Sequence, residues 1–122
     1  MRANLSVLGL VAGATMLLPG AASAACESIT LGAAISLTGK YATNGIHTQN
    51  GYEFAIQKIK DAGGVKVDGK CYNFDVIYYD DESKGDRAAT LAERLINQDK
   101  VQYMLGPYSS GMTKAIAPVT EK

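Results

Sequence analysis

Two adjacent serines stand where the sequence offers its clearest candidate for binding a small molecule. The stretch GPYSSGMT (residues 106–113) follows an apolar run, 101–105, and precedes apolar residues at helical spacing. We expect Ser109 or Ser110 to cap that helix. A helix start has unpaired N–H groups and the positive end of the dipole, so it attracts a carboxylate. The pair therefore favours contact with an anionic ligand. The alternative is that one serine caps the helix and the other is merely solvated.

A second polar stretch, SLTGKYATNG (residues 36–45), follows another apolar run. In an open α/β sheet, ligands bind outside the carboxyl ends of the strands, where neighbouring connections leave in opposite directions. If the strands lie in the order 2-1-3, the loops at 36–45 and 106–110 face each other there. Tyr41, Asn44 and Tyr108 would then supply apolar wall and hydrogen bonds, so we predict them as ligand-binding residues together with both serines. The alternative is that all three are ordinary rim residues.

The acidic run Asp80-Asp81-Glu82 is the other candidate for chemistry. Carboxylates at a strand end sometimes hold a divalent cation, but the pattern favours residues that cap and solvate the next helix. The sole histidine, His47, has no cysteine or serine partner nearby in the sequence, and neither GxGxxG after the first strand nor GxxxxGK[ST] occurs. We therefore predict no catalytic residue, no metal and no cofactor.

The first 24 residues have the regions of a secretory signal peptide. A short basic start precedes a mostly apolar stretch, 5–18, and Ala22-Ser23-Ala24 offers a cleavage site. The apolar stretch is too short to anchor comfortably in a bilayer. A lipoprotein attached at Cys26 is disfavoured, because Ser23 stands where such a signal usually has leucine. We therefore expect residues 1–24 to be removed on export.

The charge balance excludes some partners. The chain carries 12 basic and 12 acidic side chains, and loss of the leader removes one arginine, which leaves a net charge of −1. This balance gives no electrostatic footprint for nucleic acid or anionic lipid. Residues 25–122 remain, which is enough chain for one core and hence one domain.

Two cysteines, Cys26 and Cys71, would enter an oxidising compartment, where a disulfide forms readily. Each lies just upstream of a predicted strand, so the two sulfurs meet at one edge of the sheet if those strands are parallel neighbours. We expect this bridge, and the alternative is two unpaired buried thiols. Two isolated cysteines and one histidine lack the ligand spacing of a metal site.

The remaining sequence alternates strands with helices. Apolar runs predict strands at 29–36, 74–79 and 101–106, and helical spacing predicts helices at about 46–62, at 88–96 and from 110 onward. Asp68-Gly69 predicts the tight turn of a small hairpin before the second strand. The βαβαβα pattern predicts a three-layer α/β fold with an open, mostly parallel sheet. The pattern does not fix the strand order, and we expect 2-1-3 because this order brings both polar loops to one crevice. The third strand would leave a bare apolar edge, so we expect the front part of a longer protein.

Three stretches resemble the type I periplasmic solute-binding proteins, in particular the leucine/isoleucine/valine-binding proteins of ABC transporters. They are ITLGAAISLTGKYATNG, NGYEFAIQKIKDAGGV and YYDDESKGDRAATLAERLINQDKVQYMLGPYSS, which with their connections cover nearly the whole chain after the leader. The resemblance implies two α/β lobes that close on a small molecule, with residues 25–122 as a partial N-terminal lobe. It also implies that Ser110 holds the ligand carboxylate beside Ser109, and that Tyr41 and Asn44 line the pocket.

The implied role is that of a periplasmic substrate-binding component without enzymatic activity. It would capture a branched-chain or other amino acid, or a related carboxylate, and deliver it to an ABC permease in the inner membrane. The residue types of the first loop depart from those of the branched-chain amino acid binders, so the resemblance leaves the ligand open. An extracellular ligand-sensing domain of a receptor has the same lobe and is the alternative. An exported metal enzyme built on Asp80 and Asp81 is a third hypothesis.

Overall fold

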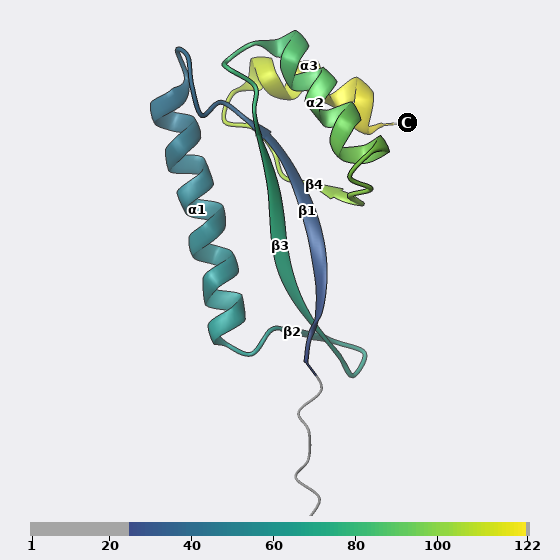
Figure 1. Cartoon of the computed structure of the whole chain (residues 1–122). Helices are drawn as coiled ribbons and strands as arrows, with labels where there is room; N and C mark the ends of the chain where they lie inside the picture. Colours follow the sequence, from purple (N-terminus) through teal and green to yellow (C-terminus); the bar gives the residue numbers. More distant parts are fainter. Residues whose placement is uncertain (1–24, 122) are drawn as a thin grey trace, which may run out of the picture.

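The computed structural model describes residues 25–121, so the predicted signal peptide, residues 1–24, lies outside the described residues (Figure 1). Among the helices described, none is long and apolar enough to cross a membrane. The elements are β1 (Glu27–Ile35), α1 (Ala42–Asp61), β2 (Val65–Val67), β3 (Lys70–Asp80), α2 (Gly85–Asn97), β4 (Tyr103–Met104) and α3 (Ser110–Thr120).

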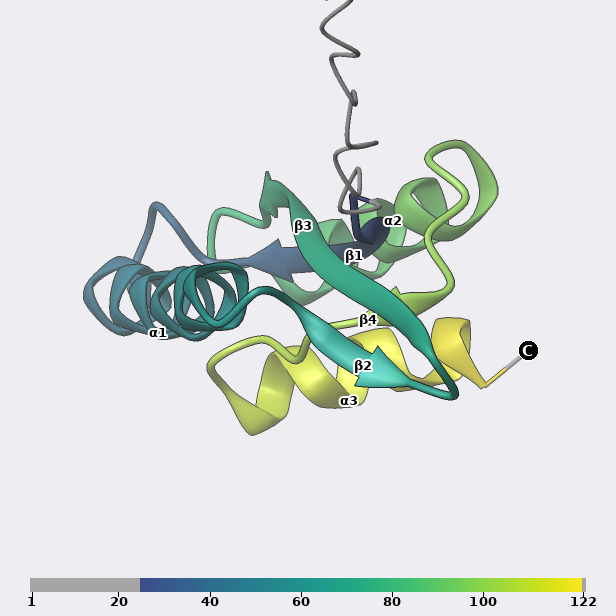
Figure 2. The ribbon, with the colours of Figure 1, turned by 90° about the horizontal axis from the view of Figure 1, so that it is seen from below.

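The four strands form one sheet in the order β2-β3-β1-β4. β1 is parallel to β3 along its whole length and parallel to β4 at Leu31 and Gly32, whereas β2 is antiparallel to β3. The parallel part therefore has the predicted 2-1-3 order, with β2 added at the outside. Figure 2 views the sheet from below and shows its strands twisted relative to one another, as is usual in β-sheets.

Helices cover both faces of the sheet, which confirms the three-layer α/β fold. Figure 1 shows α1 on one side of the strands and α2 with α3 on the other. The α2 and α3 side holds the core, since its buried cluster joins β1 to both helices and to the turn before β4. Its members are Ala34, Ala88, Ala92, Leu95, Val101, Met112 and Ile116. On the opposite face, α1 buries only Gly45.

Two elements differ in extent from the prediction. α1 begins at Ala42 instead of near residue 46, and β4 is two residues long instead of spanning 101–106. β4 lies at the edge of the described sheet and pairs with β1 alone, at Leu31 and Gly32. It approaches β1 over Gly32, where a Cβ atom would lie 2.9 Å from the side chains of both Met104 and Val101.

β2 and β3 form the predicted hairpin, and β3 continues without a break into the predicted second strand. Asp68 and Gly69 at its turn have φ values of 48° and 80°, the left-handed backbone that such two-residue turns require. The predicted disulfide is also confirmed. Cys26 and Cys71 are bridged at the starts of β1 and β3, with their Cα atoms 4.6 Å apart.

Candidate functional site

The loops that follow β1 and β4 meet at the carboxyl end of the sheet. The rings of Tyr41 and Tyr108 have centroids 6.1 Å apart and planes inclined by 55°. The hydroxyl of Tyr52 on α1 donates a hydrogen bond to the carbonyl oxygen of Gly106, at 2.7 Å. The structure therefore brings the two polar loops together on one side of the sheet, as the 2-1-3 order requires.

The second of these loops ends in a helix cap. Ser109 has the extended backbone of an N-cap residue, and its Oγ accepts the N–H of Met112 at 3.3 Å. Ser110 is the first residue of α3 and is exposed, and Tyr108 keeps 47% of its surface. The prediction that one serine caps the helix is confirmed for Ser109, which leaves the hydroxyl of Ser110 exposed at the helix start.

The first loop is held by Asp80, the last residue of β3. One carboxylate oxygen accepts the N–H groups of Leu37, Thr38 and Glu82 at 2.9, 3.2 and 2.9 Å. The other accepts the hydroxyl of Thr38 at 2.7 Å. Burial raises the pKa of Asp80, but the hydrogen bonds from Thr38, Glu82 and Leu37 outweigh it and hold this pKa below its usual range. Asp80 therefore fixes the loop as a carboxylate.

Asp81 is fully buried beside it and pairs with the same loop. Its Oδ1 accepts the hydroxyl of Ser36 at 2.6 Å and the N–H of Ser83 at 2.7 Å, while its Oδ2 has no hydrogen-bond partner among the described residues. We expected this acidic run to cap the start of α2. That detail is wrong, because the N-cap of α2 is Lys84 and no side chain makes a capping hydrogen bond there. Both aspartates instead bond the loop after β1. Within residues 25–121, no cluster of three or more His, Cys, Asp or Glu could hold a metal ion.

Asn44 does not lie in the loop where the sequence placed it. It is exposed in the first turn of α1. The dipeptide Asn44-Gly45 is typical of a turn, but Gly45 serves a different purpose, since a Cβ atom there would overlap the carbonyl oxygen of Ser36. Glycine thus lets the start of α1 pack directly against the residue that follows β1. A ligand contact by Asn44 stays a prediction.

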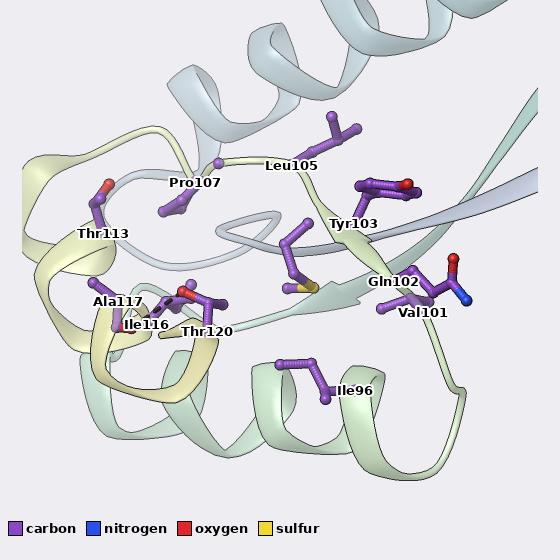
Figure 3. A pocket seen from close by; sticks show the side chains of 12 residues that line it. Ile96, Val101, Gln102, Tyr103, Leu105, Pro107, Thr113, Ile116, Ala117 and Thr120 are labelled. Atoms are coloured by element: carbon purple, nitrogen blue, oxygen red, sulfur yellow. Dashed lines mark hydrogen bonds between the residues drawn. The ribbon is translucent and has the colours of Figure 1, made fainter. Parts of the chain in front are cut away.

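A cavity of about 500 Å³ lies beside β4, at the open edge of the described sheet (Figure 3). Its walls include Ile96 of α2, Met104 of β4 and Ile116 of α3. Figure 3 shows Leu105 and Tyr103 pointing away from these helices, so the cavity lies on the α2 and α3 side. Gly106 and Pro107 of the second loop line it, but neither of the two facing tyrosines does. The cavity therefore belongs to the sheet edge, and the two tyrosine loops form the candidate site.

Four residues shape the site although no sequence pattern predicted this role: Ser36, Asp80, Asp81 and Ser83. The register shows why they meet: Ile35 pairs with Asp80, so the residues after each strand stand side by side. Hydroxyl residues after one parallel strand and paired carboxylates after its neighbour are the signal that could have revealed them.

An open α/β sheet whose loops converge where its connections diverge defines a ligand-binding lobe. The comparison with known families agrees, since residues 28–122 match the model described as periplasmic binding protein. The chain belongs to this family, in its type I, Leu/Ile/Val-binding branch. The family is one of solute-binding proteins, and membership implies a periplasmic or extracellular location.

Three similar proteins show what share of the length of a family member this chain spans. Leu/Ile/Val-binding protein homolog 3 of Brucella melitensis is 30% identical over 116 residues, which are 95% of this chain and 30% of the relative. LivJ of Streptococcus pneumoniae, solved with isoleucine, is 33% identical with a TM-score of 0.67, over 78% of this chain and 26% of that one. A solute-binding protein from Rhodopseudomonas palustris BisB5, solved with 3,4-dihydroxybenzoic acid, is 30% identical with a TM-score of 0.62, over 75% and 24%. The chain therefore spans less than a third of their length.

Proposed function

We propose that this chain forms one wall of the ligand cleft of a periplasmic solute-binding protein. The protein captures an amino acid or related small carboxylate and delivers it to an ABC permease in the inner membrane. The observation that carries the proposal is the meeting of the Tyr41 and Tyr108 loops at the start of α3. The predicted signal peptide, residues 1–24, supports export. The relatives solved with isoleucine and with 3,4-dihydroxybenzoic acid both hold small carboxylic acids.

The start of α3 suits the carboxylate of such a ligand. The side chain and the carbonyl of Ser109 already accept the N–H groups of Met112 and Thr113. The N–H groups of Ser110 and Gly111 come earlier in the helix, where no intrahelical acceptor exists, and they point toward the approaching anion. The hydroxyl of Ser110 adds a donor without adding a competing charge. Tyr41 and Tyr108 then supply the wall for the rest of the ligand.

Isothermal titration of the full-length protein tests the binding role. The panel contains L-leucine, L-isoleucine, L-valine and 3,4-dihydroxybenzoate, followed by the other amino acids. We expect saturable binding of at least one of these carboxylates. Absence of binding across the whole panel would overturn the proposed function.

A matched pair of tyrosine variants tests the location of the site. Tyr108→Ala removes half of the facing pair, and we expect it to weaken the affinity at least about tenfold, as the loss of a central aromatic contact does. Tyr103→Ala removes another exposed tyrosine, 58% against 47%, that lies in β4 outside both loops. We expect its affinity to stay within about twofold of the wild type. Equal losses in both variants would place the site elsewhere.

Uptake by whole cells separates transport from sensing. Deletion of the gene should abolish high-affinity uptake of the ligand found by titration. Normal uptake in the deletion strain would favour the ligand-sensing alternative, because a sensor uses the same binding site without delivering its ligand.

A further inference from the structure

We infer that Ser83, which belongs to neither of the two facing loops, is the positioning residue that holds Tyr41 against Tyr108. The consequence for ligand affinity rests on the proposed function, whereas the effect on Tyr41 itself does not. Ser83 lies in the turn between β3 and α2, and nothing in its sequence context marks it as part of a site.

The hydroxyl of Ser83 bridges Thr38 and Tyr41 within the first loop. It donates a hydrogen bond to the carbonyl oxygen of Thr38 at 2.7 Å and accepts the N–H of Tyr41 at 3.0 Å. Tyr41 is the N-cap residue of α1, and its own side chain makes no capping hydrogen bond. A residue 42 positions further along the chain therefore accepts the N–H of the N-cap residue, the bond that the N3 side chain makes in a capping box.

The loop also closes tightly around this hydroxyl. Gly39 has a φ of 81°, and a Cβ atom there would lie 2.6 Å from the carbonyl oxygen of Glu82 and 2.7 Å from the Oγ of Ser83. Only glycine leaves room for the turn of Glu82 and Ser83 to enter the loop. The chain between Thr38 and Tyr41 is thus wrapped around the side chain of Ser83.

Ser83 is itself fixed through its backbone. Its N–H donates to the buried carboxylate of Asp81, which also accepts the hydroxyl of Ser36. Glu82 and Ser83 have φ values of 53° and 62°, a left-handed backbone that residues other than glycine adopt only when their surroundings impose it. This backbone aims the side chain of Ser83 back into the loop, so the position of Tyr41 is set from the end of β3.

Two substitutions in the full-length protein separate positioning from stability. Ser83→Ala and Ser83→Gly both remove the hydroxyl, but only glycine also relieves the left-handed backbone. A general loss of stability would therefore appear in the alanine variant and largely disappear in the glycine variant. A loss of positioning would appear in both. Ser28→Ala is the control, because it removes a hydrogen-bonded serine hydroxyl, whose partner is Asp75, far from Tyr41 and near the start of β1.

Two measurements on the ligand-free protein come first. One is the hydrogen exchange of the Tyr41 amide, and the other is the nuclear Overhauser effect between the rings of Tyr41 and Tyr108. In both Ser83 variants we expect exchange of the Tyr41 amide to accelerate at least about fivefold, the loss of one hydrogen bond, and the Tyr41–Tyr108 effect to weaken. The amides of Ala33 and Ala34 in β1 should keep their protection in both variants. Unchanged exchange at Tyr41, or an equal acceleration in Ser28→Ala, would overturn the positioning role.

The second readout is the affinity of these variants for L-isoleucine and 3,4-dihydroxybenzoate. Where the wild type binds either probe, both Ser83 variants should bind it at least about fivefold more weakly, the equivalent of one lost hydrogen bond. Normal affinity with a mobile Tyr41 would overturn the link to the ligand site. If the wild type binds neither probe nor any other carboxylate, the proposed function fails, and hydrogen exchange alone decides the role of Ser83.

Discussion

The two loops that face each other at the carboxyl end of the sheet are built in opposite ways. The loop after β4 is locally closed, since Ser109 caps the helix that it starts through the N–H of Met112. The loop after β1 has no cap of its own and is held by Asp80, Asp81 and Ser83 from the neighbouring strand end. The conformation of the loop after β4 therefore depends on residues close to it in the sequence, whereas that of the loop after β1 depends on the pairing of β1 with β3.

This difference has a consequence for stability. A local cap can be lost without disturbing the rest of the sheet, and it contributes about 1 kcal/mol. The contacts behind the first loop are buried with the end of β1, where Ser36 and Asp81 are 1% and 0% exposed. We therefore expect mutations behind the first loop to cost more stability than mutations in the second.

The largest effect is expected where α1 touches β1. Gly45→Ala places a methyl group on the carbonyl oxygen of Ser36, and backbone atoms on both sides must move to admit it. We expect the free energy of unfolding, from urea titration, to fall by about 3 kcal/mol or more.

Gly51→Ala is the control for this substitution. Gly51 lies in the same helix, and a Cβ atom added there has no neighbour within 4 Å. Alanine is the better helix former, so this variant should gain about 0.5–1 kcal/mol. Similar destabilisation at both glycines would show that the close approach of α1 to β1 is absent.

The next largest effect separates two serine–aspartate pairs that bridge β1 and β3 at opposite ends. Asp81→Ala leaves the hydroxyl of Ser36 and the N–H of Ser83 buried without their acceptor, so unfolding should become easier by about 2–3 kcal/mol. Asp75→Ala removes an exposed partner of Ser28 and Lys60, and should cost about 1 kcal/mol or less. Equal losses of unfolding free energy in the two variants, measured by urea titration, would contradict the claim that burial makes the contacts of the first loop more stabilising.

The same contrast explains how much of the fold the sequence predicts. The strand order is predicted from the requirement that two polar loops share one crevice, and the disulfide from two cysteines that each precede a predicted strand. The hairpin turn at Asp68-Gly69 follows from the pattern of neighbouring residues. The start of α1 does not, because the dipeptide Asn44-Gly45 also suits a turn, and only the packing of Gly45 on Ser36 decides for a helix. The length of β4 is missed as well, since the apolar run 101–105 does not show that only Tyr103 and Met104 pair with β1.

The candidate site also contains some residues whose roles follow from local sequence and others whose roles depend on strand pairing. A serine before a helix is a local signal, so Ser109 could be predicted as a cap. The roles of Asp81 and Ser83 require the register of β1 against β3, which no local pattern contains. Whether Tyr41, Asn44, Tyr108 and the two serines contact a ligand stays a prediction until the titrations above are done.

A smaller effect is expected at the cap of α3. Ser109→Ala should lower the free energy of unfolding by about 1 kcal/mol, because it frees the N–H of Met112. Ser110→Ala, at the exposed neighbour, should change it by less than about 0.5 kcal/mol. In the double variant with Ser83→Ala, the costs should add to within about 0.5 kcal/mol if the two loops are stabilised independently. A larger discrepancy in urea titrations would show that the tyrosine contact couples them.

The smallest effect is the pH dependence of the first loop. The pKa of Asp80 is lower in the folded protein than its usual value, so its stabilisation is complete above the unfolded pKa, about 3.9 for an aspartate. The stabilisation is lost as the pH falls through the folded pKa, because the unfolded state then binds the proton more readily. Asp80→Asn keeps an oxygen for the N–H groups of Leu37, Thr38 and Glu82 but loses the charge.

We therefore expect the wild type to exceed Asp80→Asn in unfolding free energy at pH 7, and the difference to shrink below about pH 4, close to the unfolded pKa. Urea titrations from pH 3 to 7 measure this difference directly. Ser109→Ala is the control, since its cap involves no titrating group and its deficit should stay constant over the same range. A difference for Asp80→Asn that is equally constant would mean that the carboxylate charge plays no part in holding the first loop. That loop would then depend on hydrogen-bond geometry alone, as the second loop does.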